Sequence, residues 1–133
     1  MWRRRLRWGA FWWACDWLLV AVVVWGSLTP GNDLPKSITF FNDKVLHGTA
    51  YFVLTFWFCG SLERVRWPIV AVLFAAMGGL IEILQYLMGF GRDADWYDFD
   101  ADALGIAVAL TLIYGGLGNW MAWIEKHLAS EPP

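Results

Sequence analysis

Long apolar stretches alternate with short polar segments along the chain. Four of them are long enough to approach the roughly 20 apolar residues that a helix needs to cross a bilayer, over residues 10–28, 45–62, 67–88 and 99–120. Pro30 and Pro35 mark the first connection, and short polar segments mark the other two. The first stretch follows an arginine cluster, as in a signal peptide, but its length and Asp16 favour a retained helix. The pattern predicts an all-α membrane protein, a four-transmembrane-helix bundle forming a single domain over residues 1–133.

Lysine and arginine set the orientation of these predicted helices, because basic residues in short loops are retained on the cytoplasmic side. With the N-terminus inside, seven basic residues fall on the cytoplasmic side and three on the outer side. The seven are Arg3, Arg4, Arg5, Arg7, Arg64, Arg66 and Lys126, and the three are Lys36, Lys44 and Arg92. We therefore expect both termini to be cytoplasmic.

Composition agrees with a membrane location and argues against a nucleic-acid partner. Hydrophobic residues make up 59% of the chain and charged residues 17%, which is more apolar than the roughly half that is usual in soluble domains. The net charge of -2 gives no basic footprint for DNA or RNA. Many of the 11 tryptophans lie near the ends of apolar stretches, where their rings suit the headgroup region.

Ionisable side chains gather at one end of the predicted bundle. In the orientation above, the second helix starts at the outer face, the third ends there and the fourth starts there. The polar residues at this level are Asp43, Lys44, His47, Glu82, Gln85, Arg92, Asp93, Asp95, Asp98, Asp100 and Asp102. The sequence therefore predicts one polar site at the extracytoplasmic face.

Helical spacing predicts which of these residues share a face, because residues three or four apart lie side by side. The expected groups are Asp43, His47 and Tyr51; Glu82, Gln85 and Tyr86; and Asp98, Asp102 and Gly105. Small residues at four-residue spacing on the third and fourth helices predict close helix contact.

Charged groups at this depth need compensation, because each costs at least ~2.5 kcal/mol in hydrocarbon. We expect His47 to bridge Glu82 and Asp43, and Arg92 to fold back onto Asp98 or Asp102. For Asp16, pairing with the N-terminal arginines or snorkelling accounts for its position, and it is assigned to no site.

The ordered set of polar residues on the last three predicted helices resembles the VanZ-like membrane proteins. In that family the pattern D-K-x-x-H, E-x-x-Q and R-x5-D-x-x-A-N-x-x-G is typical. Its elements appear here as Asp43, Lys44 and His47, then Glu82 and Gln85, then Arg92, Asp98, Ala101 and Gly105. Asp102 stands where the family commonly has Asn. The resemblance implies a multi-pass protein of the bacterial plasma membrane, with founding members linked to teicoplanin susceptibility.

Three classes of function fit this sequence. The first is binding or handling of the head group of a membrane lipid or lipid-linked envelope precursor, with Asp43, Lys44, His47, Glu82, Gln85, Arg92, Asp98 and Asp102 as the expected ligand-binding residues. The second is a membrane-embedded hydrolase or transferase, with His47, Glu82 and Asp98 as catalytic candidates, or with Glu82, Asp98 and Asp102 around a divalent cation. The third is a structural or assembly partner or a small transporter, which as a four-helix chain would have to form a homo-oligomer. No organic cofactor is expected.

Overall fold

The computed structural model describes residues 3–30, 33–36, 42–89 and 95–129. Over these residues the protein is helical and contains no strand. The long helices are α1 (Gly9–Leu28), α3 (Asp43–Ser61), α4 (Trp67–Met88) and α5 (Trp96–Tyr114), and a shorter helix, α6 (Trp120–Ala129), follows them. The expectation of an all-α fold is therefore confirmed.

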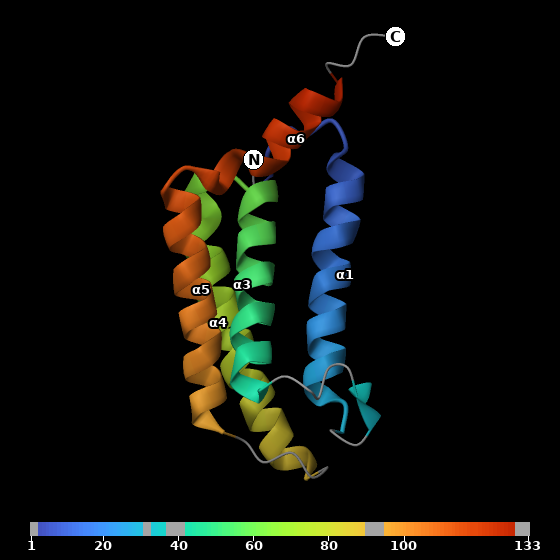
Figure 1. The fold of residues 1–133 in the computed structure, drawn as a ribbon, viewed down its shortest axis with the longest axis vertical. Coiled ribbons are helices and arrows are strands. Elements are labelled where there is room, and N and C mark those ends of the chain that lie inside the picture. The colour runs from blue at the N-terminus through green and yellow to red at the C-terminus, as the bar shows by residue number, and fades with distance from the viewer. Residues whose placement is uncertain (1–2, 31–32, 37–41, 90–94, 130–133) are drawn as a thin grey trace.

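The long helices run up and down side by side (Figure 1). Helix α1 runs toward one end of the bundle, α3 returns, α4 runs in the direction of α1 and α5 returns again. The starts of α3 and α5 therefore lie at the same end as the end of α4, while α6 and the start of α1 lie at the opposite end. We call the first of these the loop end and the second the α6 end.

Local capping explains where the helices at the loop end begin and stop. The side chain of Asn42 accepts the backbone N–H of Lys44, and the side chain of Asp95 accepts that of Tyr97, so a polar residue caps the start of both α3 and α5. Helix α4 stops at Gly89, which adopts a left-handed conformation with φ of 62°.

Helices α3 and α5 approach each other most closely where glycines face each other. A Cβ atom added to Gly105 would meet the backbone of Gly48 and Phe52. Ala109, one turn farther along α5, is fully buried. The predicted contact through small residues is thus present on α5, and its partner on α3 is Gly48.

Hydropathy identifies some of these helices as candidate membrane spans. Among the described residues, Gly9–Leu28 and Arg64–Met88 are long and apolar enough to cross a membrane. Trp96–Tyr114 and Leu117–Ala129 meet the criteria together, but they are bent by 87° relative to each other. Large apolar side chains such as Leu18, Val72 and Leu104 are exposed on the outside of the bundle, as expected for contact with lipid.

The fourth predicted helix differs from the structure at its C-terminal end. We expected it to continue to residue 120, but α5 stops at Tyr114. Gly116 follows with φ of 126°, a conformation that favours glycine and that breaks the helix. The chain then turns into α6, which crosses the α6 end of the bundle (Figure 1).

Candidate functional site

The polar residues of α3 and α5 meet at the loop end. His47 lies one turn into α3, and Asp98 and Asp102 lie in the first two turns of α5. His47 is 6% exposed, Asp98 is 3% exposed and Asp102 is 1% exposed. The predicted faces of these two helices are therefore the ones that turn into the bundle.

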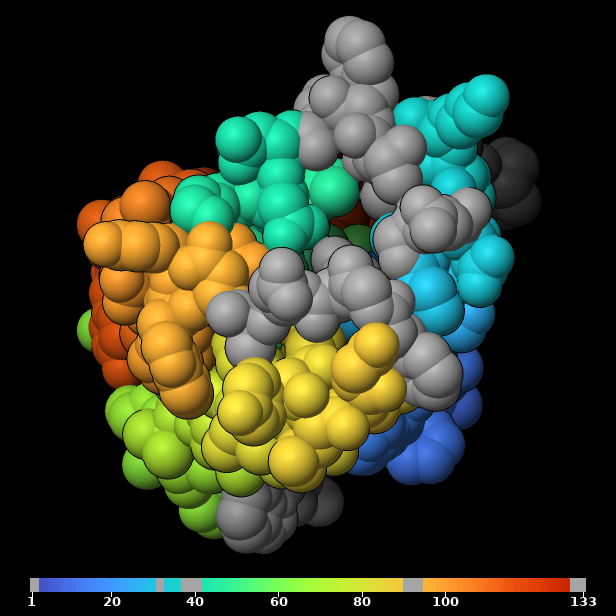
Figure 2. Space-filling view, turned by 90° about the horizontal axis from the view of Figure 1, so that it is seen from below, coloured from blue at the N-terminus to red at the C-terminus, as the bar shows by residue number. Residues whose placement is uncertain are grey.

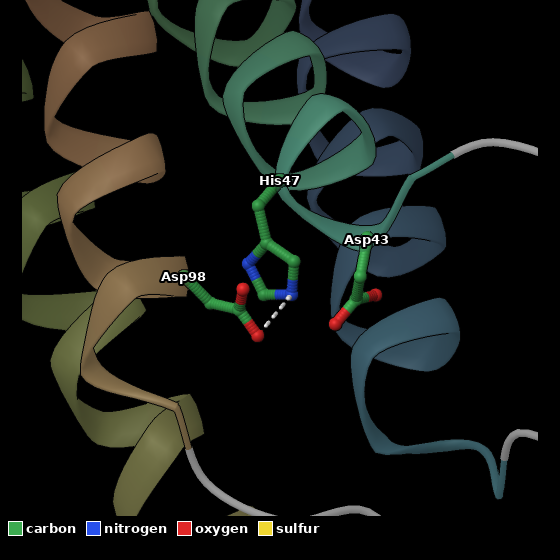
Figure 3. Close-up of side chains that lie close together, drawn as sticks. All are labelled: Asp43, His47 and Asp98. Carbon is green, nitrogen blue, oxygen red and sulfur yellow. Dashed lines mark ion pairs between the residues drawn. The ribbon is translucent and has the colours of Figure 1, made fainter.

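His47 is held between two carboxylates of α5. Its Nδ1 atom lies 2.9 Å from Oδ1 of Asp102, which is hydrogen-bond distance. Its Nε2 atom lies 3.8 Å from Oδ2 of Asp98. Figure 3 shows that Asp43, from the start of α3, lies near the same ring nitrogen, opposite Asp98. We call Asp43, His47, Asp98 and Asp102 the histidine cluster.

Lys44 closes this cluster on its solvent side. Its Nζ atom lies 3.1 Å from Oδ1 of Asp98 and 2.7 Å from Oδ2 of Asp95. The hydrogen bond from Lys44, together with the one from the backbone N–H of Tyr97, lowers the pKa of Asp95 below its usual range. Among the described residues, Lys44 thus pairs with Asp98 alongside His47, while the predicted pairing of Arg92 with Asp98 or Asp102 stays a prediction.

Glu82 is buried, but its contact differs from the expected one. Its Oε2 atom accepts the backbone N–H of Asp95 at 3.0 Å, so it fixes the residue that caps α5. The expectation that His47 contacts Glu82 is therefore wrong, because Nδ1 of the imidazole faces Asp102, and Nε2 faces Asp98 with Asp43 beside it. Glu82 supports the histidine cluster through the backbone before α5.

Gln85 connects two other helices. Its Nε2 atom donates to the backbone carbonyl of Ser27 at 2.7 Å, near the C-terminal end of α1. A helix end leaves such carbonyls without intrahelical donors, so this contact attaches α1 to α4. Tyr86 does not share this buried face as predicted, because it is 76% exposed. Arg92 and Asp93, also expected at the site, lie outside the described residues.

Buried oxygens around the histidine cluster have capacity for further bonds. Three of these oxygens have no hydrogen-bond partner among the described residues, namely Oδ2 of Asp102, Oε1 of Glu82 and the hydroxyl of Tyr51. Each of these side chains is 1% exposed. A buried oxygen without a partner costs roughly 1–3 kcal/mol. The Asp102 oxygen is directed toward Gly78 of α4.

A cavity of about 280 Å³ adjoins the histidine cluster between α1 and α3. The polar part of its wall includes Asp43, His47 and Ser27, and most of the rest is apolar. The apolar residues include Val22, Val23, Trp25, Leu46 and Ala50. Seen from the loop end, the surface is hollowed between α3 and α1 (Figure 2). This cavity could not be predicted from the sequence, because the α1 residues that line it carry no ionisable group.

Asp16 belongs to a separate polar contact toward the α6 end. Its Oδ2 atom accepts from Nη2 of Arg3 at 2.6 Å and from the Ser61 hydroxyl at 2.9 Å. The expected pairing with an N-terminal arginine is present, and Asp16 makes no contact with the histidine cluster. It has a structural role that joins α1 to α3.

The chain was compared with protein-family models, with curated proteins and with solved structures. None of them matches. The likeness to the VanZ-like family consequently depends on the spaced residues alone.

The geometry allows acid–base or ligand-binding chemistry at His47. A carboxylate on one imidazole nitrogen fixes the ring and its tautomer, and leaves the other nitrogen to accept a proton or to bind a ligand. This other nitrogen, Nε2, faces Asp43 and Asp98 at the edge of the cavity.

Proposed function

We propose that the protein is a VanZ-like membrane protein of the bacterial cell envelope that binds the head group of a lipid or lipid-linked precursor at its loop end. The observation that carries this proposal is the cavity beside α3, whose wall joins apolar residues to Asp43 and His47. A lipid has the same combination of an apolar chain and a polar head. The cavity volume, about 280 Å³, is near the lower limit for small-molecule sites and suits part of one chain.

The charges at the mouth of this cavity fit a zwitterionic head group. The Lys44 ammonium group is exposed and can bind a phosphate, while Asp43 is exposed and can accept from an amine or hydroxyl. Tyr51 also lines this cavity, while its hydroxyl is buried. A phosphate would compete with Asp95 and Asp98 for the Lys44 ammonium group.

The proposed membrane topology has four crossings, with the loop end outside and the α6 end in the cytoplasm. Helices α3 and α5 each contain 19 residues, which gives a length of about 28 Å, close to the hydrocarbon thickness. Their ionisable residues turn toward each other at one end, so a crossing would place those groups near the headgroups. The distribution of lysine and arginine supports this orientation.

Native mass spectrometry of the protein purified in detergent tests the lipid proposal. We expect the wild type to retain added phosphatidylethanolamine and Ala50→Phe, which fills the cavity, to lose it. Ala76→Phe is the matched control, because Ala76 is exposed on α4 and does not line the cavity. Equal lipid retention by both variants would contradict the proposal.

A reporter enzyme that is active only outside the cytoplasm tests the topology. We expect it to be active when inserted before α3 and inactive when fused after Pro133. Activity after Pro133 would move the proposed site to the cytoplasmic face.

A second function, hydrolysis or transfer at the bound head group, is favoured by the contact between His47 and Asp102. A carboxylate that orients an imidazole is a common arrangement for a general base. Release of the head group from labelled phosphatidylethanolamine should then disappear in His47→Ala and persist in Asp100→Asn, where the substituted residue is exposed. Absence of release in the wild type leaves binding as the function.

A further inference from the structure

The Nε2 atom of His47 points toward the carboxylates of Asp43 and Asp98. It lies 3.8 Å from Oδ2 of Asp98, which is beyond hydrogen-bond distance. One ligand atom each from Asp43, His47 and Asp98 lies within 4.8 Å of the others. Figure 3 shows the three side chains directed toward one another from the starts of α3 and α5.

The contact on the opposite side of the ring determines what Nε2 can do. With Asp102 ionised, Nδ1 carries the proton that is donated to Oδ1. A neutral imidazole then presents the lone pair of Nε2 toward the carboxylates of Asp43 and Asp98. A lone pair that faces two carboxylates is unfavourable by itself, and either a proton on Nε2 or a metal ion bound to Nε2 and the carboxylates makes the arrangement favourable.

We propose that Asp43, His47 and Asp98 bind a divalent transition-metal ion, with Asp102 orienting the imidazole ligand. A carboxylate that accepts the second N–H of a metal-binding histidine is the usual support for such a ligand. Nitrogen and oxygen ligands together suit Zn²⁺ or Mn²⁺ better than Ca²⁺ or Mg²⁺, which prefer oxygen alone. The metal set differs from the one expected from the sequence, because Glu82 binds the Asp95 backbone.

The distances are compatible with such an ion. Zn²⁺ lies about 2.0–2.2 Å from nitrogen and oxygen ligands, so two ligand atoms in a tetrahedral arrangement lie about 3.4 Å apart. The observed 3.8 Å between Nε2 and Asp98 is close to this value, and the 4.8 Å limit for the trio requires side-chain movements on the order of 1 Å. Asp43 is exposed, so an ion reaches the site from the aqueous side.

Two independent features of the surroundings also favour a cation. His47 is 6% exposed, so bulk water has little access to its imidazole. The buried Oδ2 of Asp102 has no hydrogen-bond partner in the described part of the chain, nor does Oε1 of Glu82. Carboxylates at such depth are stabilised by positive charge, and a divalent ion supplies it.

Isothermal titration of the detergent-purified, tag-free protein with ZnCl₂, and then with MnCl₂, tests the metal site. We expect one ion per chain. Asp43→Asn and Asp98→Asn should each weaken binding at least about tenfold, and Asp102→Asn should weaken it about 10–100-fold through the imidazole. Asp100→Asn is the matched control, because it makes the same change on an exposed position two residues from Asp98.

The melting temperature of each variant without added metal shows whether it is folded, so loss of binding at an unchanged melting temperature is not due to misfolding. A second readout is the melting temperature, which the metal should raise in the wild type and in Asp100→Asn but not in Asp98→Asn. Equal affinity in Asp98→Asn and Asp100→Asn, or no stoichiometric binding by the wild type, would overturn the proposal.

The metal site is independent of the lipid site in these tests. Titration uses protein without added lipid, and the cavity variant Ala50→Phe should retain metal while losing lipid. Loss of metal without loss of lipid, or the reverse, therefore identifies which proposal has failed.

Discussion

Substitution of Gly105 by alanine should separate the two helices that carry the histidine cluster. The added Cβ would lie 3.0 Å from the carbonyl carbon of Gly48 and 3.0 Å from the backbone nitrogen of Phe52, and closer still to the carbonyl oxygen of Gly48. Ordinary contact begins at 3.4 Å, so these two atoms alone require a shift of 0.4 Å, and the oxygen requires more. Because all three are backbone atoms, no side-chain rotation can relieve the overlap.

The magnitude follows from the rigidity of this contact. Overpacking a core usually costs about 1–3 kcal/mol, and a contact between two helix backbones belongs at the upper end of this range. A loss of about 3 kcal/mol corresponds to a decrease in melting temperature on the order of 10 °C for a chain of this size. The separation also moves Asp102 away from His47, since Asp102 lies one turn from Gly105.

Thermal unfolding in detergent, followed by circular dichroism, measures this effect. Gly79→Ala is the control, because a Cβ at Gly79 would meet only the Phe99 ring at the ordinary distance of 3.6 Å. We expect the control to melt within a few degrees of the wild type. If Gly105→Ala melts together with Gly79→Ala, then α3 and α5 do not meet at these glycines and the reasoning is refuted.

Three further predictions concern single polar contacts and are measured by thermal unfolding in detergent. Asp16→Ala removes the acceptor of the buried Ser61 hydroxyl and of Arg3, whose side chain is 32% exposed. We expect it to lower the free energy of unfolding by roughly 2 kcal/mol or more. Arg5→Ala, at an exposed position, should leave the free energy of unfolding unchanged. Gln85→Leu removes the donor to the end of α1 and should cost about 1 kcal/mol, while the exposed Tyr86→Phe should be neutral. The pKa of Asp95 is lowered in the folded protein, so Asp95 contributes to stability above its unfolded pKa of 3.8. This stabilisation is lost as the pH falls through the lower folded pKa. The wild type should therefore lose more stability than Asp95→Asn on acidification from pH 5 to below about 3, and an equal loss would count against the contact with lysine.

The positions of the long helices and the convergence of polar residues could be predicted, because both depend on the spacing of apolar and polar residues along the sequence. The apolar stretches set the helices, and a helix pitch of 3.6 residues places His47 and Tyr51, or Asp98 and Asp102, on one buried face. The end of the fourth helix was placed too late. The breaking signal was the Gly115–Gly116 pair, and it lies within an otherwise apolar stretch.

The partners of the polar side chains could not be predicted in the same way. Which acid meets His47 depends on the rotation of α3 against α5, and this rotation is set by the contact between Gly48 and Gly105 rather than by any charge. Gln85 was expected in the polar site by depth alone, yet its neighbour across the bundle is the carbonyl of Ser27. The cavity depends on how far α1 stands from α3, and no residue pattern in α1 encodes that distance.

The two ends of the bundle use buried acids differently, and this difference supports a ligand at the loop end. Asp16, toward the α6 end, has an arginine of its own and a serine hydroxyl, both on Oδ2, while its Oδ1 has no hydrogen-bond partner among the described residues. At the loop end, the buried Asp98 and Asp102 and the partly exposed Asp95 share Lys44 and His47. A bundle that needed only internal cohesion would gain stability by replacing such acids with apolar residues, since buried ion pairs contribute little net stability. Retaining this arrangement beside a cavity is more readily explained by a cation or head group that supplies the additional positive charge.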